Sequence, residues 1–167
     1  MSQTEYLAIA AELLQMADAD QAMRKRAAPN SAAWDASLDA APQRRLEEII
    51  NQIGWPTIPL VGAEASHAAW LIAQHAPDLV FMERCLALMR NLPANSIHPA
   101  EIAYLQDRVL MRRGELQIYG AQCAGIGGEF HVHPIQDQER VDERRASVGL
   151  GPFAEYEAQI RGQVAGD

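Results

Sequence analysis

The sequence predicts a mostly α-helical fold: a single-domain helical bundle of about six or seven helices with a small β-hairpin insertion. Apolar residues recur at intervals of three and four in several segments, as on one face of a helix. Proline and glycine separate these segments. A length of 167 residues suits one domain with one core. Within this domain, 1–167, we expect N-terminal helices over 1–53 and a motif-bearing core over 54–156.

The N-terminal part contains the first predicted helix, over about residues 4–26. Its apolar positions from Leu7 to Ala17 follow the helical period, with acidic residues early and basic residues late, as the helix dipole favours. Pro29 and Asn30 end it. A short helix is expected around Trp34 and Leu38.

Proline and glycine set the boundaries of the next elements. Pro42 suits the start of a helix that ends at Gly54. Residues 54–59 contain two prolines and predict an extended connection, because proline lacks an N–H donor and restricts the residue before it. Further helices are then expected over about 63–75, 79–92 and 99–112.

The last third has a different composition. Residues 116–120 favour a β-strand, 121–128 are rich in glycine and alanine, and 130–133 alternate in polarity, which together predict a two-stranded hairpin. Helical composition returns over 137–148 and near 153–164.

Charge and composition exclude several classes of partner. The net charge is −8, and the 13 arginines and one lysine are scattered along the chain. This argues against nucleic acid and against an anionic membrane surface, both of which need clustered positive charge. No run approaches the roughly 20 apolar residues of a membrane span, and the N-terminus does not resemble a signal peptide. Cys85 and Cys123 show no paired spacing, so reduced thiols and a cytoplasmic location are expected.

His75 is the most informative single residue. It falls in the middle of the apolar face formed by Ala65, Ala68 and Ile72, so its side chain is expected to point inward. An inward imidazole at a helix end suits a catalytic acid or base. The alternative is a core histidine hydrogen-bonded to a buried carbonyl or carboxylate.

Asp107 and Arg108 flank the apolar face of the predicted helix 99–112. A buried aspartate needs a hydrogen-bond donor, and His75 is a candidate, which would give a carboxylate-oriented imidazole. The alternative is that Asp107 and Arg108 are separate surface anchors.

Gln117, Tyr119 and Gln122 would converge if residues 116–120 form a strand. Amide and phenol groups both donate and accept hydrogen bonds, so this set suits a polar small molecule. The alternative is a hydrogen-bonded strand edge that braces the loop.

Three other patterns carry weaker signals. His131 and His133 lie on one side of the predicted hairpin, as metal ligands would, yet no further ligand spacing accompanies them. Gly125 to Gly128 lacks the lysine and hydroxyl residue of a phosphate-binding loop. Arg144 and Arg145 either form ion pairs within their helix, or one of them turns inward to bind a carboxylate or to fix Asp107.

One ordered series of motifs resembles a bacterial family, a domain of unknown function, over roughly residues 45–156. The series is Gly54-Trp55-Pro56-Thr57, Val61-Gly62, Gln74-His75-Ala76, Tyr104-Leu105-x-Asp107-Arg108-Val109, Gln117-x-Tyr119-Gly120-x-Gln122, Asp142-x-Arg144-Arg145 and Val148-Gly149-Leu150, with Tyr156. The resemblance implies that His75, Asp107, Arg108, Gln117, Tyr119, Gln122 and Arg144 belong together. The chain departs from the family pattern at Gln106 and Ala121, where the pattern has threonine.

Two classes of function fit these residues. The first is a small cytoplasmic enzyme without a cofactor, in which His75 and Asp107 are catalytic and Arg108, Gln117, Tyr119, Gln122 and Arg144 hold a polar or anionic small molecule. The second is a non-catalytic ligand-binding or protein-interaction module in which the same residues form a structural polar network. A metal protein using His75 with His131 or His133 is a third, weaker hypothesis. No sequence feature specifies the oligomeric state.

Overall fold

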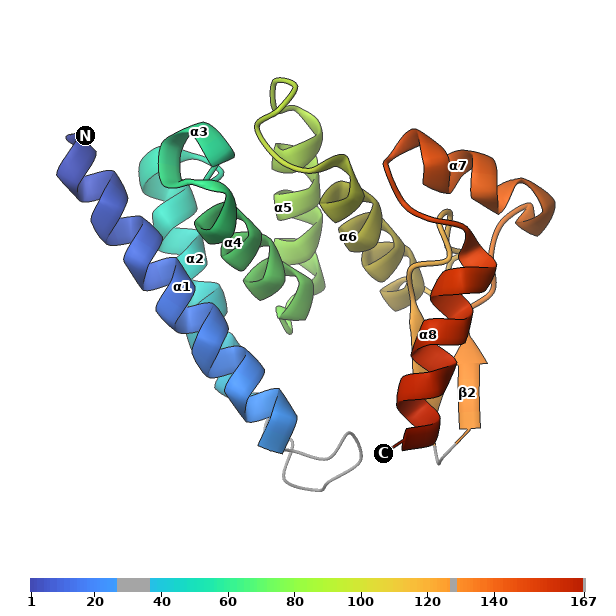
Figure 1. Cartoon of the computed structure of the whole chain (residues 1–167). Helices are drawn as coiled ribbons and strands as arrows, with labels where there is room; N and C mark the ends of the chain where they lie inside the picture. The colour runs from blue at the N-terminus through green and yellow to red at the C-terminus, as the bar shows by residue number, and fades with distance from the viewer. Residues whose placement is uncertain (27–36, 127–128, 167) are drawn as a thin grey trace. The chain divides into compact units, whose positions relative to one another are not determined.

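The mostly helical fold is confirmed in a computed structural model of the chain, which describes residues 1–26, 37–126 and 129–166 (Figure 1). Over these ranges it contains eight α-helices, one short 3-10 helix and two β-strands. The chain divides into two compact units, Met1–His98 and Pro99–Asp167. One domain over the whole chain stays a prediction.

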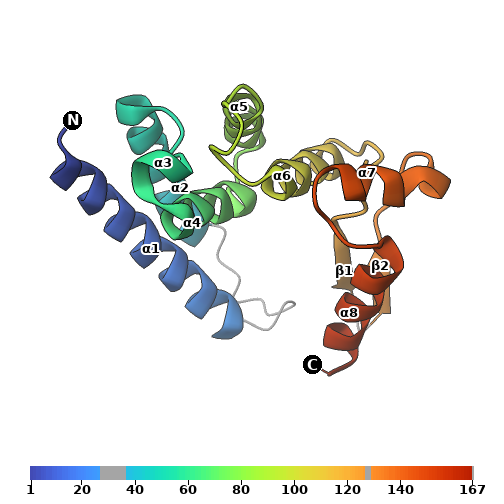
Figure 2. The ribbon, with the colours of Figure 1, turned by 45° about the horizontal axis from the view of Figure 1, so that its top comes forward.

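The first unit contains five helices around a core of aliphatic and alanine side chains. They are α1 (Gln3–Arg26), α2 (Ser37–Ile53), α3 (Ile58–Val61), α4 (Ala63–His75) and α5 (Leu79–Arg90). Figure 2 shows α1 running alongside α3 and α4. Leu13, Leu46 and Ile49 are completely buried. Because α1 and α2 both pack against α4, the first unit extends past residue 53.

Two expectations for this unit are wrong in detail. Pro42 lies inside α2, several residues after Ser37, instead of at its start. The connection 54–59 is not extended throughout, because the short helix α3 begins directly after Thr57. Pro59 occupies the first turn of this helix, where a missing N–H costs nothing. The helix expected around Trp34 lies outside the described residues.

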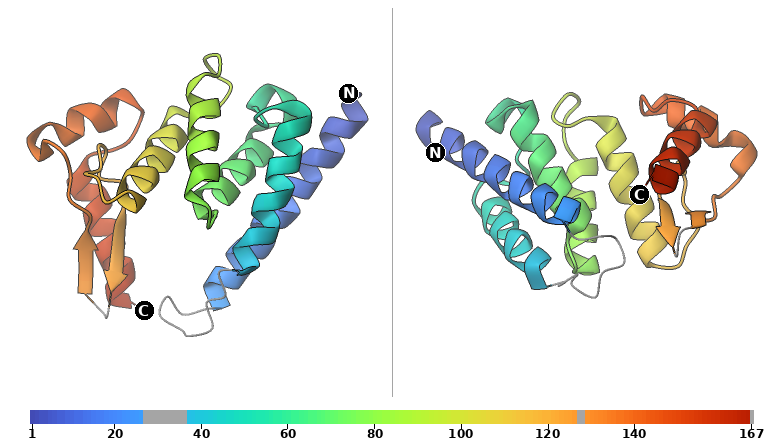
Figure 3. Two further views of the ribbon diagram at one scale, coloured as in Figure 1. Left: turned by 180° about the vertical axis from the view of Figure 1, so that it is seen from behind. Right: turned by 60° about the horizontal axis from the view of Figure 1, so that its bottom comes forward.

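The second unit combines helices with a β-hairpin. Its elements are α6 (Pro99–Arg112), β1 (Cys123–Ile126), β2 (Glu129–Val132), the 3-10 helix η1 (Gln138–Arg140), α7 (Val141–Ser147) and α8 (Phe153–Gly166). The strands are antiparallel, with Cys123 opposite Val132. Both pack against α8, as Figure 3 shows from behind.

The hairpin was predicted, but its first strand begins later than expected. Residues 116–120 form a loop, apart from a single bridge between Gln117 and Ile135. In the part of the chain that the structure describes, no helix has the length and apolar character needed to cross a bilayer.

Candidate functional site

Asp107 is the structural centre of the second unit. It lies on α6 with no exposed surface, and its carboxylate accepts hydrogen bonds from three backbone amides. Oδ1 is 2.7 Å from the amide nitrogen of Ile118, and Oδ2 is 2.9 Å from that of Tyr119 and 3.0 Å from that of Ala121. A buried carboxylate is stable only with such donors. Asp107 therefore fixes the following loop, residues 117–122.

Two arginines hold the same loop from its carbonyl side. Arg144 donates from Nε to the carbonyl of Ile118 at 2.7 Å, and Arg145 donates to the carbonyl of Tyr119 at 2.8 Å. Arg145 is only 2% exposed and also binds the carbonyl of Gly151 at 2.6 Å. The 117–122 loop is thus held between a carboxylate on its N–H groups and guanidinium groups on its carbonyls.

Gln117 and Gln122 close the two ends of this loop. The amide nitrogen of Gln122 donates to Oε1 of Gln117 at 2.8 Å, and the Gln117 side chain donates to the carbonyls of Gln122 and His133. The Gln122 side chain reaches the carbonyl of Tyr104 at 3.3 Å. Gln117 has no exposed surface, so all its polar atoms serve the fold.

Aromatic residues of α8 cover the other side of the loop. The Tyr156 hydroxyl donates to the carbonyl of Ala121 at 3.0 Å, and the Arg145 guanidinium lies 5.0 Å from the centre of the Tyr156 ring. Gly120 has a φ of +65°, and a Cβ there would lie 2.7 Å from the ring of Phe153. The backbone approaches α8 too closely for any other residue.

Burial governs the titration of this network. It raises the pKa of Asp107, against the opposing effect of the loop amides and the Arg145 charge. Burial, with the neighbouring Tyr104 and Cys123, also raises the pKa of Tyr156. Burial and the charge of Glu157 raise the pKa of Cys123 to about 11, so this thiol stays protonated near neutral pH.

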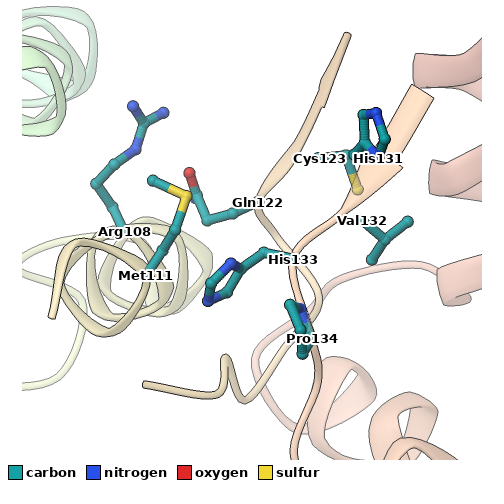
Figure 4. Close-up of a pocket in the computed structure, with 8 residues that line it drawn as sticks. All are labelled: Arg108, Met111, Gln122, Cys123, His131, Val132, His133 and Pro134. Atoms are coloured by element: carbon teal, nitrogen blue, oxygen red, sulfur yellow. The ribbon is translucent and has the colours of Figure 1, made fainter. Parts of the chain in front are cut away.

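A pocket of about 500 Å³ opens next to the 117–122 loop, within the second unit. Figure 4 shows Arg108 and Met111 on α6 at one side and residues of the hairpin at the other. Its polar lining consists of an arginine, two histidines, a glutamine and a cysteine, and no described lining residue is acidic. The residues are Arg108, Met111, Gln122, Cys123, His131, Val132, His133 and Pro134.

His75 belongs to the first unit and is hydrogen-bonded to a different aspartate from the one expected. Its Nδ1 lies 2.7 Å from Oδ2 of Asp20 on α1. The suggested hydrogen bond from His75 to Asp107 is therefore wrong, because backbone amides already satisfy Asp107 and Asp20 occupies Nδ1. The expectation that His75 points inward is met in part, since 16% of its side chain is exposed.

Asp20 is itself held in place by His75 and Arg24. Arg24 donates to Oδ1 at 2.9 Å, one helical turn further along α1. Burial acts to raise the pKa of Asp20, but the His75 hydrogen bond and the charges of His75 and Arg24 outweigh it, so the pKa is lowered. The carboxylate also lines a smaller, mainly apolar pocket of about 330 Å³ with Met16 and Met23.

The predicted site residues thus fall into three places. Arg108 and Gln122 meet in the pocket of the second unit. Gln117 and Tyr119 belong to the 117–122 loop, and Asp107 and Arg144 hydrogen-bond to it. His75 pairs with Asp20 in the first unit. Tyr119 takes part through its backbone, because the segment is a loop and not the expected strand.

Sequence reasoning missed Asp20 and left Arg145 and His133 outside the predicted site. For Asp20, the spacing to Arg24 gives a local signal, as an i,i+4 pair. The sequence predicts that one of the two neighbouring arginines turns inward, and in the structure both Arg144 and Arg145 bind loop carbonyls. Within the described residues, no group of three His, Cys, Asp or Glu side chains is placed to hold a metal ion.

Fold and site define a mostly helical protein with a hydrogen-bonded polar loop and an adjoining pocket. A family model described as a family of unknown function (DUF6624) matches residues 8–163, so the chain belongs to this family. This confirms the resemblance to a family of unknown function. No curated protein matches the chain, and no solved structure does.

Proposed function

We propose that the protein binds a small anionic molecule in the pocket between α6 and the hairpin. The observation that carries this proposal is the lining of the pocket, whose described residues include Arg108, His131 and His133 and no acidic side chain. A half-buried guanidinium attracts a carboxylate or phosphate more strongly than an exposed one, because water screens it less.

The chemistry of the other lining residues narrows the chemical class of the ligand further. Met111, Val132 and Pro134 supply apolar surface, while Gln122 supplies an amide. Ligand pockets commonly combine a mainly apolar wall with a few polar groups that fix orientation. The ligand is therefore a small acid with an apolar part.

In this proposal the other motif residues position the pocket and do not touch the ligand. Gln122 ends the loop that Asp107, Arg144 and Arg145 hold, and it also lines the pocket. Such supporting hydrogen bonds keep a binding group in place at no cost when the ligand arrives.

Thermal-shift measurements with a panel of small carboxylates and phosphates test the proposal. We expect acids that stabilise the wild type to lose this effect in Arg108→Gln. Arg112→Gln is the matched control, since it removes the same charge from an exposed position one turn along α6. Equal stabilisation of wild type and Arg108→Gln by every acid would contradict the proposal.

A second candidate function is acid–base catalysis at His75, as a cofactor-independent enzyme. Asp20 favours it, because a carboxylate on Nδ1 holds the proton there and leaves Nε2 to accept one. Incubating host-cell extract with wild type or His75→Gln and comparing metabolites by mass spectrometry tests it. A product formed by the wild type alone is expected, and identical profiles would rule the candidate out.

We also propose a cytoplasmic protein that does not bind nucleic acid. The buried Cys85 and half-buried Cys123 are both free thiols, as in a reducing compartment. The net charge of −8 opposes association with polyanions.

A further inference from the structure

One ring nitrogen of His133 is already hydrogen-bonded to the backbone of the protein. Its Nε2 lies 2.9 Å from the backbone carbonyl oxygen of Glu115. A carbonyl only accepts hydrogen bonds, so Nε2 carries the hydrogen. In the neutral imidazole, Nδ1 then holds a lone pair, and no other described residue hydrogen-bonds to it.

The backbone of His133 is fixed as firmly as its ring. Its amide donates to the carbonyl of Gln122 at 3.2 Å, and its own carbonyl accepts from the side chain of the fully buried Gln117. The ring is therefore held by the polar loop network before any ligand arrives, as a group that determines specificity must be.

The ring also lies in the pocket that contains Arg108. Figure 4 shows it between Met111 and Pro134, on the hairpin side, with Arg108 on the α6 side. One wall thus presents a fixed positive charge and the other a fixed hydrogen-bond acceptor. We infer that His133 selects small acids that also carry a hydroxyl group, with Nδ1 accepting the hydroxyl hydrogen while Arg108 binds the acid group.

This inference rests on the proposed function and adds the class of ligand to it: a hydroxy acid with an apolar part.

The two histidines of the sequence pattern then differ in role. His133 is oriented by Glu115, while His131 is exposed and lies on the same hairpin. His131 thus offers a control position for substitution.

Two acids that differ by one hydroxyl group test the inference, 3-phenyllactate and 3-phenylpropionate. Calorimetric titration of the wild type should give a Kd roughly ten-fold lower for the hydroxy acid, the effect of one hydrogen bond. His133→Gln should bring the Kd values of the two acids together, because glutamine places a donor near the position of Nε2 but no acceptor at that of Nδ1. His131→Gln should keep the preference.

The outcomes separate the inference from the proposed function. If neither acid binds the wild type, the inference fails, while the proposed function is decided by the wider panel of carboxylates and phosphates. If both acids bind equally and Arg108→Gln weakens both, the inference fails and the anion site stands.

Nitrogen-15 spectra of the histidine rings in the wild type provide a second readout that needs no variant. The Nδ1 signal of His133 should move on adding 3-phenyllactate and stay in place with 3-phenylpropionate. An Nδ1 signal that moves equally with both acids would overturn the inference.

Discussion

Asp107 shows how one side chain can organise a loop that has no regular secondary structure. Asp107→Asn keeps the shape but turns one acceptor oxygen into a donor that faces backbone N–H groups. Because hydrogen bonds to a buried charge are among the strongest, we expect a loss of about 3 kcal/mol in the free energy of unfolding. Urea denaturation measures it.

Glu139→Gln serves as the control for this substitution. Glu139 is exposed on η1, so its variant should stay within about 0.5 kcal/mol of the wild type. Equal stability of the two variants would show that the amide contacts of Asp107 contribute little.

Gly120 separates two effects that usually occur together, backbone strain and steric overlap. Gly120→Ala should cost about 3 kcal/mol or more, because its Cβ would meet Phe153 and its φ is +65°. Gly114→Ala, with a φ of +74° and open space around it, should cost only about 1 kcal/mol from strain. Thermal unfolding of both variants gives the comparison, and equal losses would exclude the overlap with Phe153.

Asp20 links stability to pH in the first unit. Its pKa is lowered in the folded chain, so its contribution is present above the unfolded value near 3.9 and is lost as pH falls through the folded value. We expect Asp20→Asn to be less stable than the wild type at pH 7, with the difference shrinking below about pH 4. Denaturation at a series of pH values checks this, and a constant difference would exclude the effect.

At the scale of elements, local signals predicted the helices best where proline or glycine marks their ends. The bounds of α4 and α6 agree with the expected ranges, because the apolar period and the breaks coincide there. The strand expected over 116–120 failed because its backbone groups bond to Asp107 and two arginines instead of to a neighbouring strand. These partners lie outside the segment, so the sequence pattern of residues 116–120 does not indicate them.

The candidate site was predictable to a similar extent. Residue type and motif spacing pointed to Arg108 and Gln122, which line the pocket. The partner of His75 was not predictable, since Asp20 lies 55 residues away on a helix whose polar face looked ordinary. His133 was noticed only as a weak metal ligand, because the carbonyl of Glu115 that orients it carries no side-chain signature.

The start of α2 allows a test at the level of one helix. Pro42 lies inside it, where proline lacks the N–H for the carbonyl four residues earlier. Pro42→Ala should therefore stabilise the protein by about 1–3 kcal/mol, with more helical circular dichroism. Unchanged stability would mean that the helix begins at Pro42, as the sequence suggested.

For the whole molecule, the distribution of charge leads to a prediction about partners. With a net charge of −8 and no basic run longer than Arg24-Lys25-Arg26, we expect no binding to duplex DNA, even at low salt where such binding is strongest. Fluorescence anisotropy of a labelled duplex at 50 mM and 200 mM salt measures this. Binding at 50 mM that disappears at 200 mM would show a basic surface that the sequence conceals.

The family motifs extend across both units, yet their hydrogen bonds divide between them. His75 pairs with Asp20 inside Met1–His98, while Asp107 and the arginines pair inside Pro99–Asp167. Each unit thus contains its own arrangement of hydrogen bonds among these motif residues.

The way in which the 117–122 loop is held has a consequence for tracing distant relatives. Asp107, Arg144 and Arg145 contact peptide groups, which every residue type possesses, so evolution can replace Ile118 and Ala121 without losing these bonds. A sequence alignment that gives Asp107, Arg144 and Arg145 more weight than the loop residues 118–121 will therefore detect more distant members of the family.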